Sequence, residues 1–265
     1  MIIDFHTHIF PDKIAAKTIQ SLANLASVRA ATDGTICGLI ESMDRNYVDI
    51  SVIQPVVTKP EQFDSINQFA GYINAKYKGR LVSFGGMHPD CENYKEKLEH
   101  IKEMGLPGIK LHPDYQQVMI DDVRYMNIIE YADVLDLIIL VHAGVDIGLP
   151  EPVHCPPEKA RKVLDKLEPK KMVLAHYGAW KQWDAVYEYL AGENVYFDTA
   201  FTFDYIEQEQ FVKILEKHGS DKILFATDSP WSDLGEEIEI LRSLPISGEQ
   251  MDEMLFRNAK KLLKM

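Results

Sequence analysis

Eight short runs of apolar and β-branched residues recur along the chain, and they constrain its fold more than any other feature. The runs occupy residues 1–5, 50–57, 81–87, 108–111, 137–141, 172–175, 195–197 and 223–226. Most segments between them place apolar residues three and four positions apart, as an amphipathic helix does, for example residues 64–77 and 121–135. Strands that alternate with helices in this way favour βα units and a parallel sheet.

Two architectures accommodate such a pattern. An open doubly wound sheet usually carries a glycine-rich loop after its first strand, whereas here that strand runs into His-Thr-His-Ile-Phe-Pro. Eight strands and eight crossovers in 265 residues match an α/β fold of the (β/α)8, or TIM, barrel type. No linker or low-complexity tract divides the chain, so we predict one barrel domain over residues 1–265.

The remaining segments are expected to complete this barrel. Helices at residues 232–244 and 247–263 would close it and cover its outside, and the proline-rich residues 149–157 would form a long loop over the active face. A chain that is nearly all barrel leaves little length for a cap over the substrate.

Composition excludes several classes of function. Lys plus Arg number 28 and Asp plus Glu number 41, and the resulting net charge of −13 argues against a nucleic-acid partner. No window approaches the roughly 20 apolar residues of a membrane helix, and the N-terminus lacks the features of a signal peptide. The three cysteines form no CxxC pair, which is typical of reduced thiols and predicts a cytoplasmic protein.

Polar residues gather at the ends of the predicted strands, where a barrel carries its chemistry. Six of the nine histidines lie there, namely His6, His8, His88, His112, His142 and His176, together with Lys110 and Asp228. His154 lies in the long loop, whereas His100 and His218 fall in helical segments where we expect them to face solvent. Because alternate strand residues face opposite sides, one inward assignment per strand brings these groups to the mouth: Asp4, His6, His8, Lys110, His112, His142, His176 and Asp228.

This set suits a metal. A His-x-His pair, a further histidine and a carboxylate form a nitrogen and oxygen site for a divalent ion such as zinc. Asp228 could bind the ion and accept a proton, and a histidine outside the ligand set could act as acid or base. Each residue alone has a structural alternative: Asp228 could cap a helix, and Lys110 could pair with a buried carboxylate. Their joint placement on several strands favours the metal site.

Several motifs together resemble the amidohydrolase superfamily. They are Asp4-Phe5-His6-Thr7-His8, Gly108-Ile109-Lys110-Leu111-His112-Pro113, His142, His176-Tyr177-Gly178 and Thr227-Asp228-Ser229-Pro230. The chain is most similar to the amidohydrolase-related branch that includes aminocarboxymuconate-semialdehyde decarboxylase and the resorcylate decarboxylases, and the resemblance covers essentially the whole chain.

The resemblance implies roles for individual residues. His6, His8, His142 and Asp228 would bind the metal, and His176 would be a catalytic or second-metal histidine. Lys110 would be a bridging group, carboxylated in two-metal members, or a substrate contact, and His112 could contact metal or substrate. We expect one bound ion, most simply zinc, and the presence of a second metal ion remains an alternative.

The leading expectation is a hydrolase that cleaves an amide, ester or lactone of a small organic molecule through a metal-activated water. The alternative is a metal-dependent decarboxylase of a small unsaturated or aromatic acid; the short chain favours the hydrolase. A non-catalytic barrel is a third alternative, which the complete set of site residues disfavours. Candidate pocket residues are His88, His154, Trp180 and Trp231, and the outer helices could support a homodimer.

Overall fold

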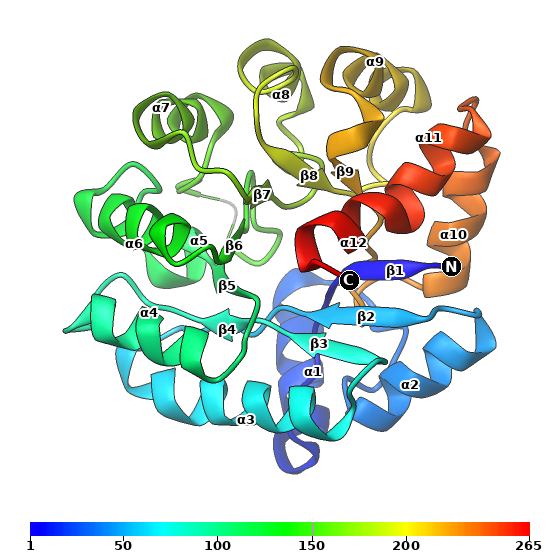
Figure 1. The fold of residues 1–265 in the computed structure, drawn as a ribbon. Helices are drawn as coiled ribbons and strands as arrows, with labels where there is room; N and C mark the ends of the chain where they lie inside the picture. The colour runs from blue at the N-terminus through cyan, green and yellow to red at the C-terminus, as the bar shows by residue number, and fades with distance from the viewer. Residues whose placement is uncertain (150) are drawn as a thin grey trace.

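The computed structural model describes residues 1–149 and 151–265 and confirms the predicted (β/α)8 barrel (Figure 1). Every predicted run contains a strand, and the third run is divided in two at Phe84. The strands are β1 (Ile3–Thr7), β2 (Ile50–Ile53), β3 (Leu81–Ser83), β4 (Gly85–Gly86), β5 (Gly108–Leu111), β6 (Ile138–Val141), β7 (Met172–Leu174), β8 (Tyr196–Asp198) and β9 (Ile223–Leu224).

The strands form a closed parallel ring. They pair in two sheets, β1-β2-β3 and β4-β5-β6-β7-β8-β9, and the short divided run 81–86 belongs to both. On the opposite side, the N–H of Phe5 donates to the carbonyl of Phe225 (2.9 Å), and the N–H of Asp228 donates to that of His6 (2.8 Å). These bonds join the first strand to the last, so the residues after β1 and β9 share one end of the barrel.

Helices surround this ring. They are α1 (Asp12–Ala26), α2 (Ile36–Arg45), α3 (Phe63–Lys76), α4 (Tyr94–Glu103), α5 (Pro113–Gln116), α6 (Val123–Val134), α7 (Pro157–Leu167), α8 (Trp183–Tyr189), α9 (Gln208–His218), α10 (Leu234–Ser243), α11 (Gly248–Asp252) and α12 (Asn258–Leu263), with a π-helical turn at Glu253–Arg257. Several begin at a side-chain cap: Thr35 accepts from the N–H of Gly38, and Asp233 accepts from that of Gly235. No helix of the described residues is long and apolar enough to cross a membrane.

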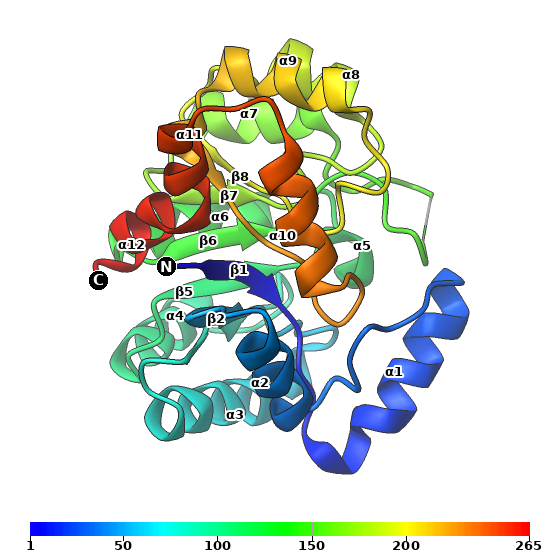
Figure 2. The same ribbon diagram turned by 90° about the vertical axis from the view of Figure 1, so that its right-hand side faces the viewer.

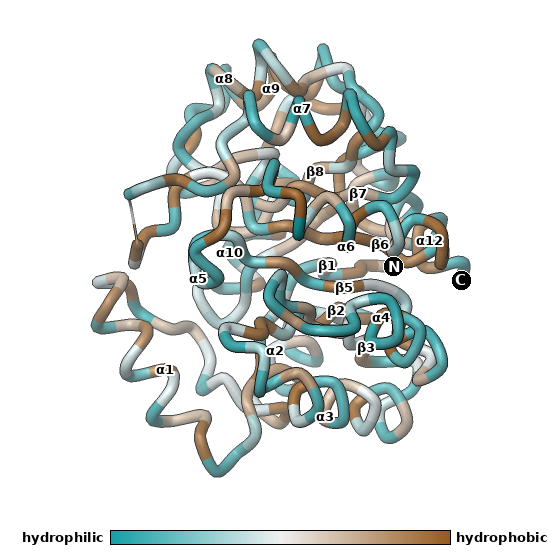
Figure 3. The backbone as a smooth tube through the Cα atoms, turned by 90° about the vertical axis from the view of Figure 1, so that its left-hand side faces the viewer, coloured by the Kyte–Doolittle hydropathy of each residue, from teal (hydrophilic) through white to brown (hydrophobic). Residues whose placement is uncertain are grey.

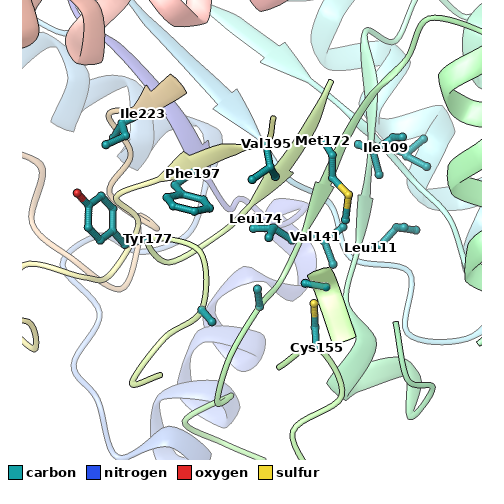
Figure 4. Packing of buried hydrophobic residues seen from close by; sticks show 14 of the residues in the cluster. Ile109, Leu111, Val141, Cys155, Met172, Leu174, Tyr177, Val195, Phe197 and Ile223 are labelled. Atoms are coloured by element: carbon teal, nitrogen blue, oxygen red, sulfur yellow. The ribbon is translucent and has the colours of Figure 1, made fainter. Parts of the chain in front are cut away.

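Two apolar clusters hold the layers together. The larger lies between the strands and the outer helices, and its labelled members, such as Ile109, Val141 and Leu174, project from neighbouring strands (Figure 4). Apolar and polar residues follow one another along the helices (Figure 3), and apolar helix residues such as Leu39, Ile73 and Ile129 belong to this cluster.

The smaller cluster fills the ring itself. It combines inward side chains such as Phe5, Val52 and Leu140 with Ala259 and Leu262 of α12. The last helical segment was expected only to close the barrel and cover its outside. Instead it is divided at the π-helical turn, and α12 closes the end of the barrel from which the strands begin, because its apolar residues complete this inner cluster.

Helix α1 is the element that the expected strand and helix series omitted. It lies beyond the C-terminal ends of the strands, whereas α12 and both chain termini lie at the opposite end (Figure 2). In the predicted loop 149–157, Pro150 lies outside the described residues, and the helical part begins at Pro157.

Candidate active site

One cavity of about 690 Å³ collects most of the predicted residues at the C-terminal end of the barrel. Its predicted lining residues are His6, His8, Lys110, His112, His142, His176, Trp180, Asp228 and Trp231. His88 and His154 are not among the described lining residues: Nδ1 of His88 accepts from the N–H of Asp90, and His154 pairs with Asp114.

Three potential metal ligands converge at the floor of this cavity. Nε2 of His6 lies 3.2 Å from Nε2 of His8 and 3.3 Å from Oδ1 of Asp228, and the latter two atoms are 3.1 Å apart. Atoms that bind one ion at about 2.1 Å lie about 3.0 to 3.4 Å apart, so this spacing fits a divalent metal. The group is buried apart from His8, which is partly exposed.

A carboxylate behind His6 fixes its orientation. Oδ2 of Asp198 lies 2.9 Å from Nδ1 of His6, and both side chains are fully buried. The carboxylate accepts a hydrogen bond from the Nδ1–H group of His6. In the neutral ring the proton is therefore on Nδ1, and Nε2 presents a lone pair to His8 and Asp228. Burial keeps this ring neutral, since it lowers the pKa of His6 well below its usual value.

Charge at the floor is divided between Lys110 and Asp228. Nζ of Lys110 lies 3.0 Å from Nε2 of His6, and burial lowers the pKa of Lys110 to about 8. Burial favours the neutral form of Asp228, but the adjacent His6 and His8 rings outweigh it and hold the pKa of this carboxyl at about 2. Lys110 therefore contacts the site through His6, and among the described residues it forms no salt bridge with a buried carboxylate.

The other histidines form a second group beside the first. Nδ1 of His142 lies 2.9 Å from Nε2 of His176, and the ring of His142 stacks on that of His112 with centroids 4.1 Å apart. His112, His142 and Asp146 make up a second set of potential ligands, and all three are buried. Three of the four predicted metal ligands thus lie together, while the fourth, His142, belongs to this neighbouring group.

The alternation of side chains along a strand correctly predicted which residues point into the barrel for some strands, but it failed for two of them. In β7, Val173 points into the ring while Leu174 packs outside, so strict alternation would turn His176 outward. His176 reaches the cavity because its backbone has a φ of 59° and leaves the strand path. In β1, Ile3 and Phe5 point inward, and the register with β2 shifts between Asp4 and Thr7, which lets His6 line the cavity.

The sequence analysis did not identify three buried carboxylates near the cavity, nor the helix that forms one of the cavity walls. Asp198 ends β8, so the strand-end rule would have found it had it been applied to that strand. Asp114 and Asp146 follow His112 and His142 at short range. The wall is α1, which contributes Lys13, Ile14, Thr18, Leu22, Leu25 and Ala26 to the cavity lining.

A family model described as amidohydrolase matches residues 3–265, and no curated protein matches the chain. A solved 5-carboxyvanillate decarboxylase from Sphingomonas paucimobilis is 13% identical, with a TM-score of 0.72 over 100% of this chain and 99% of that one. A dihydroxybenzoic acid decarboxylase from Polaromonas, with bound manganese, is 16% identical (TM-score 0.73, 99% and 96% covered). An uncharacterised TIM-barrel protein from Bordetella bronchiseptica is 18% identical (TM-score 0.79, 99% and 98% covered).

These comparisons correct two expectations. The leading prediction of a hydrolase was wrong: the similar structures of named activity are decarboxylases, which support the alternative reaction. The length of the chain does not favour a hydrolase, because such a decarboxylase is matched over 99% of its own length. Zinc finds no support either, since the metal named in those structures is manganese.

Proposed function

The chain belongs to the amidohydrolase family, and we propose that it is a metal-dependent decarboxylase of a small aromatic or unsaturated carboxylic acid. The observation that carries this proposal is the convergence of His6, His8 and Asp228 at the floor of a cavity with mainly apolar walls. One end of the cavity suits an anionic group, and the remainder suits a ring or a conjugated chain. The names of the similar structures support the same reaction.

The walls favour a flat apolar substrate body. Aromatic side chains at the mouth include Phe10, Phe69, Trp180, Phe201 and Trp231. Aromatic faces stack on one another favourably, and burial of such a ring supplies binding energy in proportion to its apolar area. We therefore assign the substrate carboxylate to the floor and its unsaturated body to the walls.

A divalent ion bound by His6, His8 and Asp228 would supply positive charge that holds the substrate's anionic oxygens. Asp198 keeps His6 in the tautomer that this role requires, and Lys110 adds a positive charge beside it. We propose manganese as the first ion to test, because a similar solved decarboxylase contains bound manganese.

Decarboxylation breaks one carbon–carbon bond and leaves its electron pair on the substrate carbon. That carbon must gain one proton as carbon dioxide leaves, so an acid R–COOH gives R–H and CO2 in balance. We assign this proton transfer to Asp228 and His176, which both line the cavity. The substrate binds as its carboxylate, so the proton comes from solvent, and Asp228 and His176 would relay it to the carbon as R–COO⁻ and H⁺ give R–H and CO2.

The direct test is carbon dioxide release from a panel of hydroxybenzoates and unsaturated acids. Protein loaded with Mn²⁺ should release carbon dioxide from at least one acid, and metal-stripped protein should not. Asp228→Asn should fold normally but lose turnover by about 100-fold or more, because a charged ligand is gone. Asp204→Asn, at an exposed position, is the matched control and should behave as wild type. No release from any acid by metal-loaded protein would contradict the proposal.

A further inference from the structure

The cavity is larger than an acid with a single ring requires. Its volume is about 690 Å³. A dihydroxybenzoate has about 11 non-hydrogen atoms, and even at the roughly 30 Å³ that one water occupies in the liquid it would fill only about half of that volume. Binding pockets usually bury most of the surface of their ligand. The volume therefore leaves room for a further part of the substrate beyond its ring.

Helix α1 gives the cavity an aliphatic wall. Ile14, Leu22 and Leu25 line the cavity from this helix. Ile14 is 49% exposed and Leu25 is 55% exposed, so about half of the surface of each stays uncovered by the described chain. Ile147, in the loop after β6, lines the same cavity and is 37% exposed. An apolar group of a ligand would bury this surface favourably.

Close packing against two loops holds α1 in place as part of the cavity. A Cβ atom at Gly34 would lie 2.6 Å from Cδ1 of Ile19, and a Cβ atom at Gly148 would lie 3.2 Å from Cδ2 of Leu25. Both glycines thus let the helix approach the adjoining loops closely. The N–H of Gly148 donates to Oδ1 of Asp146 (2.8 Å), which itself lines the cavity. The aliphatic wall is therefore continuous with the candidate active site and is not a separate docking surface.

Much of the remaining apolar lining is aromatic and suits the ring of the substrate. The rings of Trp180 and Phe201 have centroids 6.0 Å apart, and Nε1 of Trp180 donates to the carbonyl of Phe201 (3.0 Å). The branched aliphatic side chains of α1 offer no flat face on which a second ring could stack. Lys13 of α1 also lines the cavity, but this residue is exposed, so its ammonium group can stay in water. The wall that α1 forms suits an uncharged alkyl chain.

We propose that the substrate is an aromatic acid with an unbranched alkyl chain of several carbons opposite its carboxylate, and that Ile14, Leu22 and Leu25 bind this chain. The inference rests on the proposed function, which places the carboxylate at the floor of the cavity. The ring position opposite the carboxylate then points away from the floor, so a chain at that position extends toward the mouth, where α1 lies. Helix α1 determines specificity for the chain and takes no part in the reaction.

Binding of 4-alkylbenzoates tests this proposal without any turnover. Full-length protein loaded with Mn²⁺ is titrated with benzoates that carry a methyl, propyl or pentyl group at position 4, and Kd is measured by isothermal titration calorimetry. The Kd of wild type should fall by about threefold for each added CH2 group that is buried. Leu25→Asp should weaken binding of 4-pentylbenzoate by about tenfold or more and change that of 4-methylbenzoate by less than about twofold. Ser21→Asp adds the same charge at an exposed position of α1 and should keep the full gain along the series.

Ile14→Asp is the second variant in case Leu25→Asp does not fold, and circular dichroism identifies folded samples. Equal Kd values along the series in wild type would overturn the proposal, as would an undiminished gain in both Leu25→Asp and Ile14→Asp. Failure of every benzoate to bind would contradict both this proposal and the placement of the carboxylate. Carbon dioxide release judges the reaction separately: release from a dihydroxybenzoate without a gain along the series would refute only the alkyl chain, and a gain without release from any acid would refute only the decarboxylation.

Discussion

Asp198 shows how a residue outside the ligand set controls the candidate metal centre. Its Oδ2 pairs with Nδ1 of His6, while its Oδ1 accepts from the backbone N–H groups of His176 (2.9 Å) and Ala200 (3.1 Å). One carboxylate therefore orients two of the histidines that line the cavity. Such partners of metal ligands tune affinity without touching the ion.

Asp198→Asn should weaken Mn²⁺ binding by about 10- to 100-fold, which is typical of losing such a partner. The amide can still accept at Oδ1, but its NH2 group opposes the Nδ1 proton of His6 and favours the tautomer with a proton on Nε2. Titration with Mn²⁺ measures the change against the Asp204→Asn control. Unchanged affinity at His6 would show that Asp198 does not set its tautomer.

His218 corrects an expectation at the same scale, because its ring is buried and not solvent-facing. It is 6% exposed and stacks on Phe197 with centroids 3.9 Å apart, and its Nδ1 accepts from the N–H of Gly192. Burial lowers the pKa of His218 to about 4, with Lys222 lowering it further and Asp221 opposing. Helical periodicity placed His218 in α9 but could not identify the ring that packs against it.

This burial predicts a contribution to acid sensitivity. The folded pKa is below the unfolded value, so between pH 6.5 and 4 the unfolded chain binds more protons and stability falls as the pH falls. The shift corresponds to about 3 kcal/mol of unfolding free energy. Denaturant unfolding at several pH values should show that His218→Phe, which can keep the stacking, lacks this loss, whereas exposed His100→Gln retains it. Equal pH dependence in wild type and His218→Phe would contradict the assignment.

Helix α1 is the element that shapes the cavity most directly. Ile14, Thr18, Leu22 and Leu25 recur at helical spacing along the side that lines it. The helix begins directly after Pro11 with Asp12 in its first turn, which is a helix-start signal in the sequence. This signal is present in the sequence, but the predicted series has one helix between consecutive strands, and α2 already fills that place between β1 and β2.

Leu22→Asp should raise KM by about tenfold, because a charge in an apolar wall costs roughly 1–3 kcal/mol. The maximal rate and the Mn²⁺ stoichiometry should change little, since α1 contributes no metal ligand. Ser21→Asp adds the same charge at the neighbouring exposed position and is the matched control. If both variants had the same KM as wild type, α1 would not be part of the substrate wall.

Strands β1 and β7 show that the positions of the strands could be predicted from the sequence, whereas the direction of their side chains could not. Their positions followed from local apolar runs, and the rule that chemistry lies at strand ends located His6 and His176. Alternation failed within these strands because a register shift in β1 and a positive φ at His176 change the facing. Such irregularities depend on neighbouring strands and loops, so a local pattern does not reveal them.

At the scale of the whole molecule, the barrel was predictable because the same local signal repeats eight times. The shape of the cavity was not, since its walls come from segments as distant in sequence as Leu22, Phe69 and Trp231. The substrate and the reaction depend on that shape, which explains why the family resemblance was right while the leading reaction was wrong. The homodimer, the single-domain assignment and the individual ligand roles stay predictions.

The most direct test of the central claim is the product formed in D2O. A hydroxybenzoate that proves to be a substrate, with 2,6-dihydroxybenzoate as the first probe, is incubated with Mn²⁺-loaded protein and followed by NMR. Decarboxylation predicts one carbon dioxide per product and one deuterium at the carbon that carried the carboxyl group. Consumption of a panel compound with its carboxyl group retained, or carbon dioxide release equal with and without the protein, would contradict the account.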